Sequence, residues 1–336
     1  MATIRDVAKL AGVGIGTVSR VLSGKGAVSS KTLLKVNQAM EDLNFTPSSA
    51  ARSLVSKKMN TIGIWGTETS GEINRRTLRE MEDELKEFEI HLIFADGELN
   101  SKRNPNASRD SFDSLINKGC DGIIIWGTDL PPREILQIEN EFPNIALLNN
   151  QIELIDDKCF YFDHYQAGYA CGQHLIDKGH SNIACITGWL ETDDGNQRHQ
   201  GFLCALNDNN VNIPKELIFE GDYTYRKGYE GALSLLKQEL PFTALFCGND
   251  QSAMSAISAI TNNGLQVPND ISVIGYDDMN IARYTSPPLT TVRIPFNRMA
   301  ISATRRLLNL CYNLELDINY DFPVQLIERQ SVKNIG

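Results

Sequence analysis

Two patterns of apolar residues divide the chain. From residue 3 to about residue 44, apolar positions recur every three or four residues, which is the period of an amphipathic helix. From residue 61 onward, short continuous apolar runs alternate with longer stretches of helical period, which is typical of βαβ units and parallel sheets. The pattern therefore predicts a small helical domain followed by a larger α/β domain.

The helical region begins with two short helices separated by glycines. Thr3 is a good N-cap for the first helix, and Gly12 is suited to end it in a left-handed conformation. A third helix is predicted from Ser29, its N-cap, to Asn44. The apolar positions of the first two helices are Ile4, Val7, Ala8, Ala11, Val18, Val21 and Leu22, and those of the third are Leu33, Val36, Met40 and Leu43.

The glycines of residues 12–17 have a second interpretation, as a loop that holds the phosphates of a nucleotide. Such a loop needs a buried strand directly before its glycines. Residues 3–11 have a helical period instead, so the sequence favours helix, tight turn and helix. We therefore expect a helix-turn-helix and no bound cofactor.

The charge of the chain is divided in the same way. The net charge of −10 argues by itself against a nucleic-acid partner, but residues 1–58 carry nine Lys and Arg against three acids. The remaining residues carry 23 basic and 39 acidic side chains. A small basic module joined to an acidic body indicates localised contact with phosphates.

A short helix is predicted after the third helix, with Thr46 as cap and Pro47 at its first position. Helices shorter than about a dozen residues are marginal in water, so this segment should become ordered only against a partner. Leu54 lies in it among small residues, without an obvious core to join. An apolar residue of this kind can wedge into the minor groove of DNA and bend the duplex.

The α/β region contains seven predicted strands and at least six predicted helices, which form two similar sets divided near residues 159–163. The strands are 61–65, 90–95, 122–126, 145–148, 183–187, 244–247 and 271–274. The helices are 76–88, 108–117, 168–178, 200–209, 226–236 and 251–263.

Aromatic and polar side chains follow the ends of these strands, where open parallel sheets bind ligands. The three tryptophans of the chain all lie there. Aromatic faces together with amide and carboxylate groups are suited to a sugar, which offers flat C–H surfaces and several hydroxyls. The side chains at strand ends are Trp65, Trp126, Asn149, Trp189, Asn249 and Asp277.

Residues 3–54 resemble the headpiece of LacI/GalR-family transcriptional regulators. The resemblance is carried by Thr3-Ile4, Asp6-Val7-Ala8, Ala11-Gly12-Val13, Thr17-Val18-Ser19-Arg20-Val21 and Pro47…Ala51-Arg52-Ser53-Leu54. It implies that the second helix enters the major groove of operator DNA and that residues 47–56 form a hinge helix. The implied DNA-binding residues are Thr3, Ile15, Gly16, Thr17, Ser19, Arg20, Ala51 and Leu54. Since Gly16 has no side chain and Ile15 offers only apolar contact, Arg20 is expected to read the operator by hydrogen bonds.

The resemblance continues more loosely to the end of the chain. It implies a type I periplasmic-binding-protein fold, with an effector between two lobes and later crossings near residues 291–295 and 320–323. The loop of residues 67–73 lacks the proline-and-aromatic sequence often found there, so the first-lobe side of the site stays open. The effector-binding residues implied by the matching segments are Asp163, Arg198, Tyr223, Asn249, Asp277 and Phe296, to which the strand ends add Trp65, Trp126 and Trp189.

Together these features predict a small all-α helix-turn-helix domain (residues 1–46), a hinge and linker (47–60), and a two-lobed, parallel-sheet α/β effector domain (61–336). The first lobe should span 61–161 and 293–321, and the second 162–292 and 322–336. We expect a homodimeric repressor that binds a pseudo-palindromic operator and responds to a sugar. Asp193 and Asp194 favour a neutral sugar over an anionic effector.

Two other classes of protein are disfavoured. A transport-type sugar-binding protein would need a signal peptide and no basic headpiece. A sugar-modifying enzyme would need catalytic groups, whereas the sequence has no nucleophile elbow, no P-loop and no metal-ligand spacing among its five histidines. Dispersed cysteines and the lack of a membrane-spanning run favour the cytoplasm.

Overall fold

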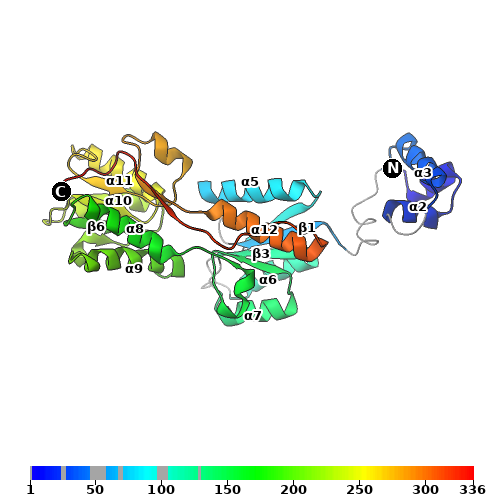
Figure 1. Cartoon of the computed structure of the whole chain (residues 1–336), viewed down its shortest axis with the longest axis horizontal. Coiled ribbons are helices and arrows are strands. Elements are labelled where there is room, and N and C mark those ends of the chain that lie inside the picture. Colours follow the sequence, from blue (N-terminus) through cyan, green and yellow to red (C-terminus); the bar gives the residue numbers. More distant parts are fainter. Residues whose placement is uncertain (1, 24–27, 46–57, 67–70, 97–104, 128–129) are drawn as a thin grey trace.

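The computed structural model describes residues 2–23, 28–45, 58–66, 71–96, 105–127 and 130–336. The helical region contains α1 (Ile4–Ala11), α2 (Ile15–Ser23) and α3 (Ser30–Asp42), and the α/β region follows (Figure 1). Among the described residues, no helix is both long enough and apolar enough to span a lipid bilayer. The predicted hinge helix, with Ala51 and Leu54, lies outside the described residues.

Residues of the predicted turn separate α1 from α2. Thr3 caps α1, because its hydroxyl accepts a hydrogen bond from the Asp6 backbone N–H while the Asp6 carboxylate accepts one from the Thr3 backbone N–H at 2.8 Å. Gly12 ends the helix with a φ of 67°, a conformation that glycine adopts without steric cost. The buried core of the three helices consists of Val7, Ala8, Ala11, Val18, Val36 and Ala39.

The third helix begins as predicted, with the Ser29 side chain capping its first turn. The predicted apolar stripe is confirmed at three of its positions, but it is wrong for Leu33, which is 42% exposed. Val36 and the small side chain of Ala39 fill the centre of this core. The first turn of α3 therefore leaves Leu33 at the surface.

The first lobe surrounds a five-stranded parallel sheet in the order β2-β1-β3-β4-β5. Helices α5 and α12 cover one face of it, and α6 and α7 cover the other (Figure 1). Alternate strand residues enter the two layers, so that Ile124 packs towards α5 and α12 while Ile123 and Ile125 pack towards α6 and α7. The elements are β1 (Thr61–Gly66), α5 (Glu72–Lys86), β2 (His91–Asp96), α6 (Pro105–Asn117), β3 (Gly122–Trp126), α7 (Pro132–Glu141), β4 (Ile145–Leu148), η1 (Glu153–Lys158), β5 (Cys159–Phe160) and α12 (Phe296–Tyr312).

The second lobe repeats this arrangement around a four-stranded parallel sheet in the order β7-β6-β8-β9. Helices α8 and α9 cover one face, and α10 and α11 cover the other. The elements are α8 (His164–Asp177), β6 (Ile183–Ile186), α9 (Asp193–Asp208), η2 (Lys215–Leu217), β7 (Ile218–Phe219), α10 (Tyr225–Leu236), β8 (Ala244–Cys247), α11 (Asp250–Asn262), β9 (Ser272–Ile274) and η3 (Asn280–Tyr284).

The chain passes between the lobes after β5, returns before α12, and passes again before its C-terminus (Figure 1). Two of these segments contain β10 (Thr291–Arg293) and β11 (Gln325–Ile327), which pair antiparallel. Asp278 ties them to the second lobe, because its buried carboxylate accepts from the Arg293 side chain at 2.7 Å and from the Arg329 side chain. The fold is therefore an all-α helical domain followed by a two-lobed, parallel-sheet domain.

Candidate functional site

The exposed side of α2 carries the residues predicted to read DNA. Ile15 is 47% exposed, and both Gly14 and Gly16 face open space. The Arg20 Nε donates to the Gly16 carbonyl at 3.2 Å, so the guanidinium lies along the exposed surface of α2. Thr17 and Ser19 are half-buried, and Thr3 is exposed and caps α1. The helix thus presents one long polar side chain beside two positions without side chains.

Arg198 of α9 lies at the centre of a second group of polar residues, in the second lobe. It is only 6% exposed, and its Nη1 donates to the Gly248 carbonyl. Its Nη2 lies 3.6 Å from a carboxylate oxygen of Asp194, one helical turn earlier. The guanidinium carbon lies 3.7 Å from the centre of the Tyr276 ring and 5.2 Å from that of Tyr223. Two aromatic faces and one carboxylate therefore hold the cation in place.

Close packing of α8 against α9 positions this arginine. A Cβ at Gly168 would lie 2.0 Å from the Arg198 carbonyl oxygen, and one at Gly201 would lie 1.9 Å from that of Tyr165. Only glycine fits at either position. The two helices can therefore approach closely enough to bury Arg198 against the Tyr276 ring.

The charges in this cluster depend on one another. Burial disfavours the charged form of Arg198, but Tyr223, Tyr276 and the nearby carboxylates hold its pKa above the usual value. Burial also raises the pKa of Asp194, but Arg198 acts together with hydrogen bonds from Thr192 and Gly195 and leaves that pKa below its usual value. For Asp277, burial outweighs the attraction of Arg198 and raises the pKa to about 7. The cluster thus contains one cation, one stable anion and one carboxyl group that titrates near neutral pH.

Replacing Asp277 with asparagine should therefore remove a pH dependence of stability. Its pKa is 3.8 in the unfolded chain and about 7 in the folded one, so between these values the folded state binds more protons and loses stability as the pH rises. We expect the melting temperature of Asp277→Asn, relative to the wild type, to increase by a few degrees from about pH 5 to about pH 8. Scanning fluorimetry measures this difference.

The neighbouring Asp278 provides the control for this measurement. Burial opposes ionisation of Asp278, but hydrogen bonds from Arg329 and Arg293 leave its pKa below the usual value. It is ionised throughout that pH range, so Asp278→Asn should lower the melting temperature by the same amount at both ends. If the melting-temperature difference between Asp277→Asn and wild type were equally independent of pH, that result would contradict the raised pKa of Asp277.

Strained backbone gathers in the same region. Asn149, Tyr223, Asp277 and Asp278 all have positive φ values, and that of Asp277 reaches 115°. Side chains other than glycine adopt this region at a cost, and such residues concentrate at functional sites. The surrounding structure therefore holds these four residues in place despite the strain.

A pocket of about 450 Å³ opens between the lobes beside this cluster. From the second lobe it is lined by Asp277 and the segment that follows, and from the first lobe by the beginning of α5 and by Phe296. At this opening the Asn280 backbone N–H donates to the Glu72 carboxylate at 3.1 Å, joining the two lobes. The ring centres of Phe296 and Trp126 lie 5.5 Å apart. The pocket thus combines ionisable groups with an aromatic wall.

The structure brings together most of the residues predicted for the effector. Asn249 donates from its side chain to the Tyr223 carbonyl at 2.9 Å, and Trp189 packs edge-on against the Tyr223 ring. Trp65 is not brought to this group, since it is 1% exposed and its indole N–H donates to Ser111 in the first-lobe core. Asp163 is exposed and caps α8, so its part in the site stays a prediction.

Three residues of the cluster were not among the predicted site residues. Asp194 lies four residues before Arg198, the spacing of an ion pair on a helix, and this spacing could have identified it. Tyr276 directly precedes Asp277 in the sequence, which was a weaker signal. His164 directly follows the predicted contact Asp163, and its side chain is buried whereas that of Asp163 is exposed. No sequence pattern indicated His164.

Comparison with known proteins identifies both regions. Residues 3–48 match the family model "Bacterial regulatory proteins, lacI family", and residues 173–332 match "Periplasmic binding protein-like domain". The HTH-type transcriptional repressor PurR of Photorhabdus laumondii is 35% identical over 341 residues, which cover 99% of this chain and 97% of the relative.

Two solved structures show the same fold. The lac repressor dimer bound to operator and the anti-inducer ONPF has a TM-score of 0.86 at 28% identity, over 99% of each chain. A sugar-binding LacI-family regulator of Escherichia coli, complexed with phosphate, has a TM-score of 0.74 at 29% identity, over 82% of this chain and 99% of the other.

A helix-turn-helix domain joined to a two-lobed body with a polar pocket is the architecture of a DNA-binding transcriptional regulator. This chain belongs to the lacI family of bacterial regulatory proteins. The relatives named above are regulators rather than enzymes, which agrees at the family level with the expectation of a protein without catalytic activity.

Proposed function

We propose that this protein is a repressor of a sugar-utilisation operon, controlled by a neutral sugar that binds between the lobes. The observation that carries the proposal is the cluster around Arg198. Among the described residues, the buried Nε of Arg198 has no hydrogen-bond partner, although burying an unpaired donor is costly. A ligand hydroxyl at this nitrogen would satisfy it.

The surroundings of Arg198 favour a neutral polyol over an anion. Asp194 balances its charge, and Asp277 would become a second anion when ionised. Carboxylates accept hydrogen bonds from hydroxyls, whereas they repel a phosphate or carboxylate ligand. Phe296 lines the pocket and offers an aromatic face on which a sugar ring can stack, and the Tyr223 ring lies beside the Arg198 guanidinium. The related regulator from Escherichia coli is described as sugar-binding, which supports the same ligand class.

A thermal-shift screen tests this proposal. Glucose, galactose, fructose, ribose, lactose and cellobiose at millimolar concentration form the panel, and sugar phosphates and purine bases provide two other ligand classes. We expect at least one neutral sugar to raise the melting temperature and to release operator DNA, because a ligand of the native state stabilises it. Stabilisation by sugar phosphates or purines alone would overturn the assignment.

We further propose that two headpieces bind a pseudo-palindromic operator. Arg20 would read a base edge, Ile15 would contact a thymine methyl, and Leu54 would wedge into the minor groove. Thr3, Thr17, Ser19 and Ala51 would contact the DNA around them.

The proposed domain limits are 1–46, 47–60 and 61–336. Within the last of these, the first lobe would comprise 61–161 and 293–321, and the second lobe 162–292 and 322–336. Operator binding would place the protein in the cytoplasm, without catalysis or a membrane partner.

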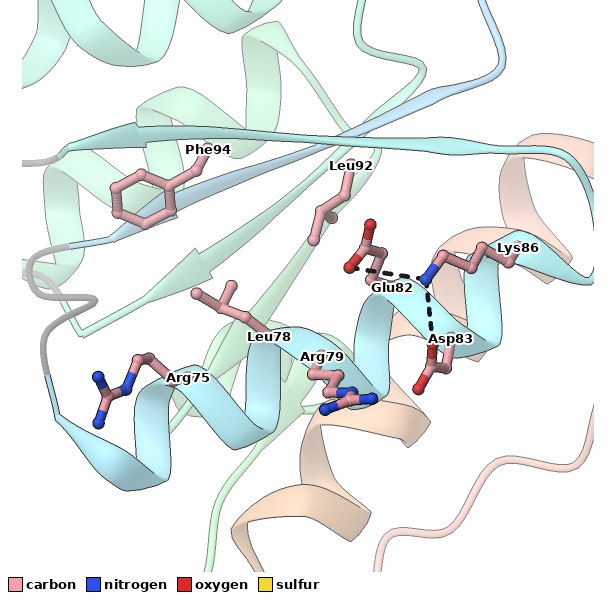
Figure 2. A pocket seen from close by; sticks show the side chains of 8 residues that line it. All are labelled: Arg75, Leu78, Arg79, Glu82, Asp83, Lys86, Leu92 and Phe94. Atoms are coloured by element: carbon pink, nitrogen blue, oxygen red, sulfur yellow. Dashed lines mark hydrogen bonds and ion pairs between the residues drawn. The ribbon is translucent and has the colours of Figure 1, made fainter.

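The homodimer that this requires would form on the side of α5 and β2. A groove of about 540 Å³ separates them, with Leu78 at its base and Leu92 and Phe94 along the strand (Figure 2). Within the described chain, β2 is an edge strand of its sheet. In this groove basic side chains come first along α5 and are followed by acidic ones and then by Lys86, so a two-fold interface can set the basic part of one helix against the acidic part of the other. The charged residues of the groove are Arg75, Arg79, Glu82, Asp83 and Lys86.

Replacing Phe94 with glutamate should convert the dimer to a monomer and weaken operator binding. Phe94 is 36% exposed at the groove, and a charge there would lose its hydration when a second subunit covers it. Analytical ultracentrifugation measures the change. Leu154→Glu, at an 80% exposed position on η1, is the control and should leave the dimer intact. A wild-type monomer, or a Phe94→Glu dimer of unchanged affinity, would contradict the proposed interface.

A further inference from the structure

His164 occupies an unusual position between the two lobes. It is the first residue of α8, directly after the first crossing, and it is 6% exposed. Its Nε2 lies 2.8 Å from the side-chain oxygen of Asn149, and its Nδ1 lies 3.2 Å from the Tyr276 hydroxyl. The Phe162 ring packs against it with a centre-to-centre distance of 4.0 Å. Both ring nitrogens are therefore engaged, one on each side.

The two hydrogen bonds determine which protons the imidazole carries. The Asn149 oxygen can only accept, so Nε2–H donates to it. In a neutral ring the Nδ1 lone pair then accepts from the Tyr276 O–H. Burial and the positive charge of Arg198 hold the pKa of His164 far below its usual value, which keeps the ring neutral. The ring thus links a donor on one side to an acceptor on the other.

The two partners belong to different lobes. Asn149 follows β4 of the first lobe, where its backbone N–H donates to the Phe160 carbonyl at 2.8 Å. Tyr276 follows β9 of the second lobe, and the Arg198 guanidinium stacks on its ring. A continuous series of contacts therefore runs from Arg198 through Tyr276 and His164 to the first lobe.

We propose that His164 is the positioning residue that couples the Arg198 pocket to the orientation of the first lobe. This rests on the proposed function, since it concerns how occupancy of that site is transmitted. A short, stiff side chain can reach both Asn149 and Tyr276 in only one relative orientation of the lobes. A rotation that breaks either bond leaves a buried polar atom unpaired, so the pair of bonds favours one orientation. A ligand that shifts Arg198 on the Tyr276 ring would change this preference.

His164→Phe and Asn149→Gly test the proposal. The first keeps the ring volume and removes both polar atoms, and the second removes the acceptor at a positive φ that glycine tolerates. In wild-type protein, each sugar of the panel is titrated with and without operator, and the ratio of the two affinities measures the coupling. We expect each variant to reduce the ratio roughly tenfold or more, whatever its affinity for sugar alone, because a direct loss of sugar contact changes both affinities equally and leaves the ratio unchanged.

Two further comparisons separate coupling from packing. If the two residues act through one bond, the double variant should reduce the ratio no more than either single variant. His164→Gln keeps a donor near the Nε2 position and should recover part of the ratio. A His164 that only fills space would lower the melting temperature in His164→Phe and leave the ratio unchanged. That result would overturn the proposal.

A measurement without any sugar keeps this proposal separate from the assignment of the ligand. Leu154 and Leu240 are exposed, one on each lobe, and each is replaced with a spin-labelled cysteine. Pulsed electron paramagnetic resonance then measures the distance between the two labels. The labelled protein is diluted with unlabelled chains. Cys204, which is partly exposed, is replaced with serine. We expect one narrow distribution in wild type and a broader or shifted one in His164→Phe and Asn149→Gly. Identical distributions would overturn the coupling proposal even if a sugar binds, whereas altered ones without sugar binding would refute only the proposed ligand.

Discussion

Arg198→Ala abolishes the response to the effector while operator binding persists, which is the largest effect that we expect at the pocket. In the proposed site the guanidinium would donate charged hydrogen bonds to the sugar, each worth about 1.5–3 kcal/mol. Losing two of them would weaken sugar binding by roughly a hundredfold or more. The headpiece does not include this residue, so operator affinity without sugar should stay within a few-fold of wild type. Calorimetry with the sugar, and an operator-release assay, measure the two properties.

This variant needs a control for folding, because it leaves Asp194 without its cationic partner. An unpaired buried charge can destabilise a protein by several kcal/mol. The double variant Asp194→Asn/Arg198→Gln removes both charges and should regain stability without regaining the sugar response. A normal sugar response in either protein would show that the effector binds elsewhere. Loss of operator binding in both would indicate that the cluster is structural.

The strands could be predicted from sequence because of how they are buried. Parallel strands covered on both faces read as continuous apolar runs, such as Ile123–Trp126 within β3. All seven predicted strands are present, with ends within one residue of those predicted. Four strands were not predicted. Strands β5 and β7 have two residues each, and β10 and β11 have three each, too few to form a pattern.

The helices were predicted less completely than the strands. Their first turns are polar and face solvent, so apolar periodicity begins after the helix does. Helix α9 begins at Asp193, seven residues before the predicted position, and its signal is the Thr192 cap. Helices α7 and α12 were not predicted, although the lobe limits implied by the family resemblance already placed the residues of α12 in the first lobe.

The candidate site shows the same division between local and tertiary information. Arg198, Asn249 and Asp277 could be predicted because each lies in a recognisable segment at the end of a strand or beside one. Trp65 also lies at the end of a strand, β1, but its side chain points into the first-lobe core. Sequence position gives the end of a strand and not the direction of the side chain. His164 could not be predicted, since its two partners lie 15 and 112 residues away.

Removing residues 1–57 should eliminate operator binding while the sugar pocket stays intact. Residues 1–58 carry nine basic and three acidic side chains, whereas the rest of the chain is strongly acidic. Proteins that make six to ten phosphate contacts lose about 10³–10⁵ in affinity between low and moderate salt. We expect such a steep salt dependence for the full chain and no measurable binding for the truncated one. Truncation after residue 57 keeps Lys58, which donates to the Cys311 carbonyl, and Met59, whose N–H donates to Asp121.

Arg20→Ala separates sequence reading from charge within the same headpiece. A good pair of hydrogen bonds to one base is worth about 1–3 kcal/mol of discrimination. The ratio of operator affinity to random-DNA affinity should therefore be roughly tenfold to a hundredfold smaller in the variant than in wild type. Lys9→Ala removes one charge at an exposed position of α1 and should weaken binding to operator and to random DNA equally. Because Gly14 and Gly16 offer no side chains to the groove, an unchanged preference in Arg20→Ala would mean that the bend at Leu54, rather than α2, selects the operator.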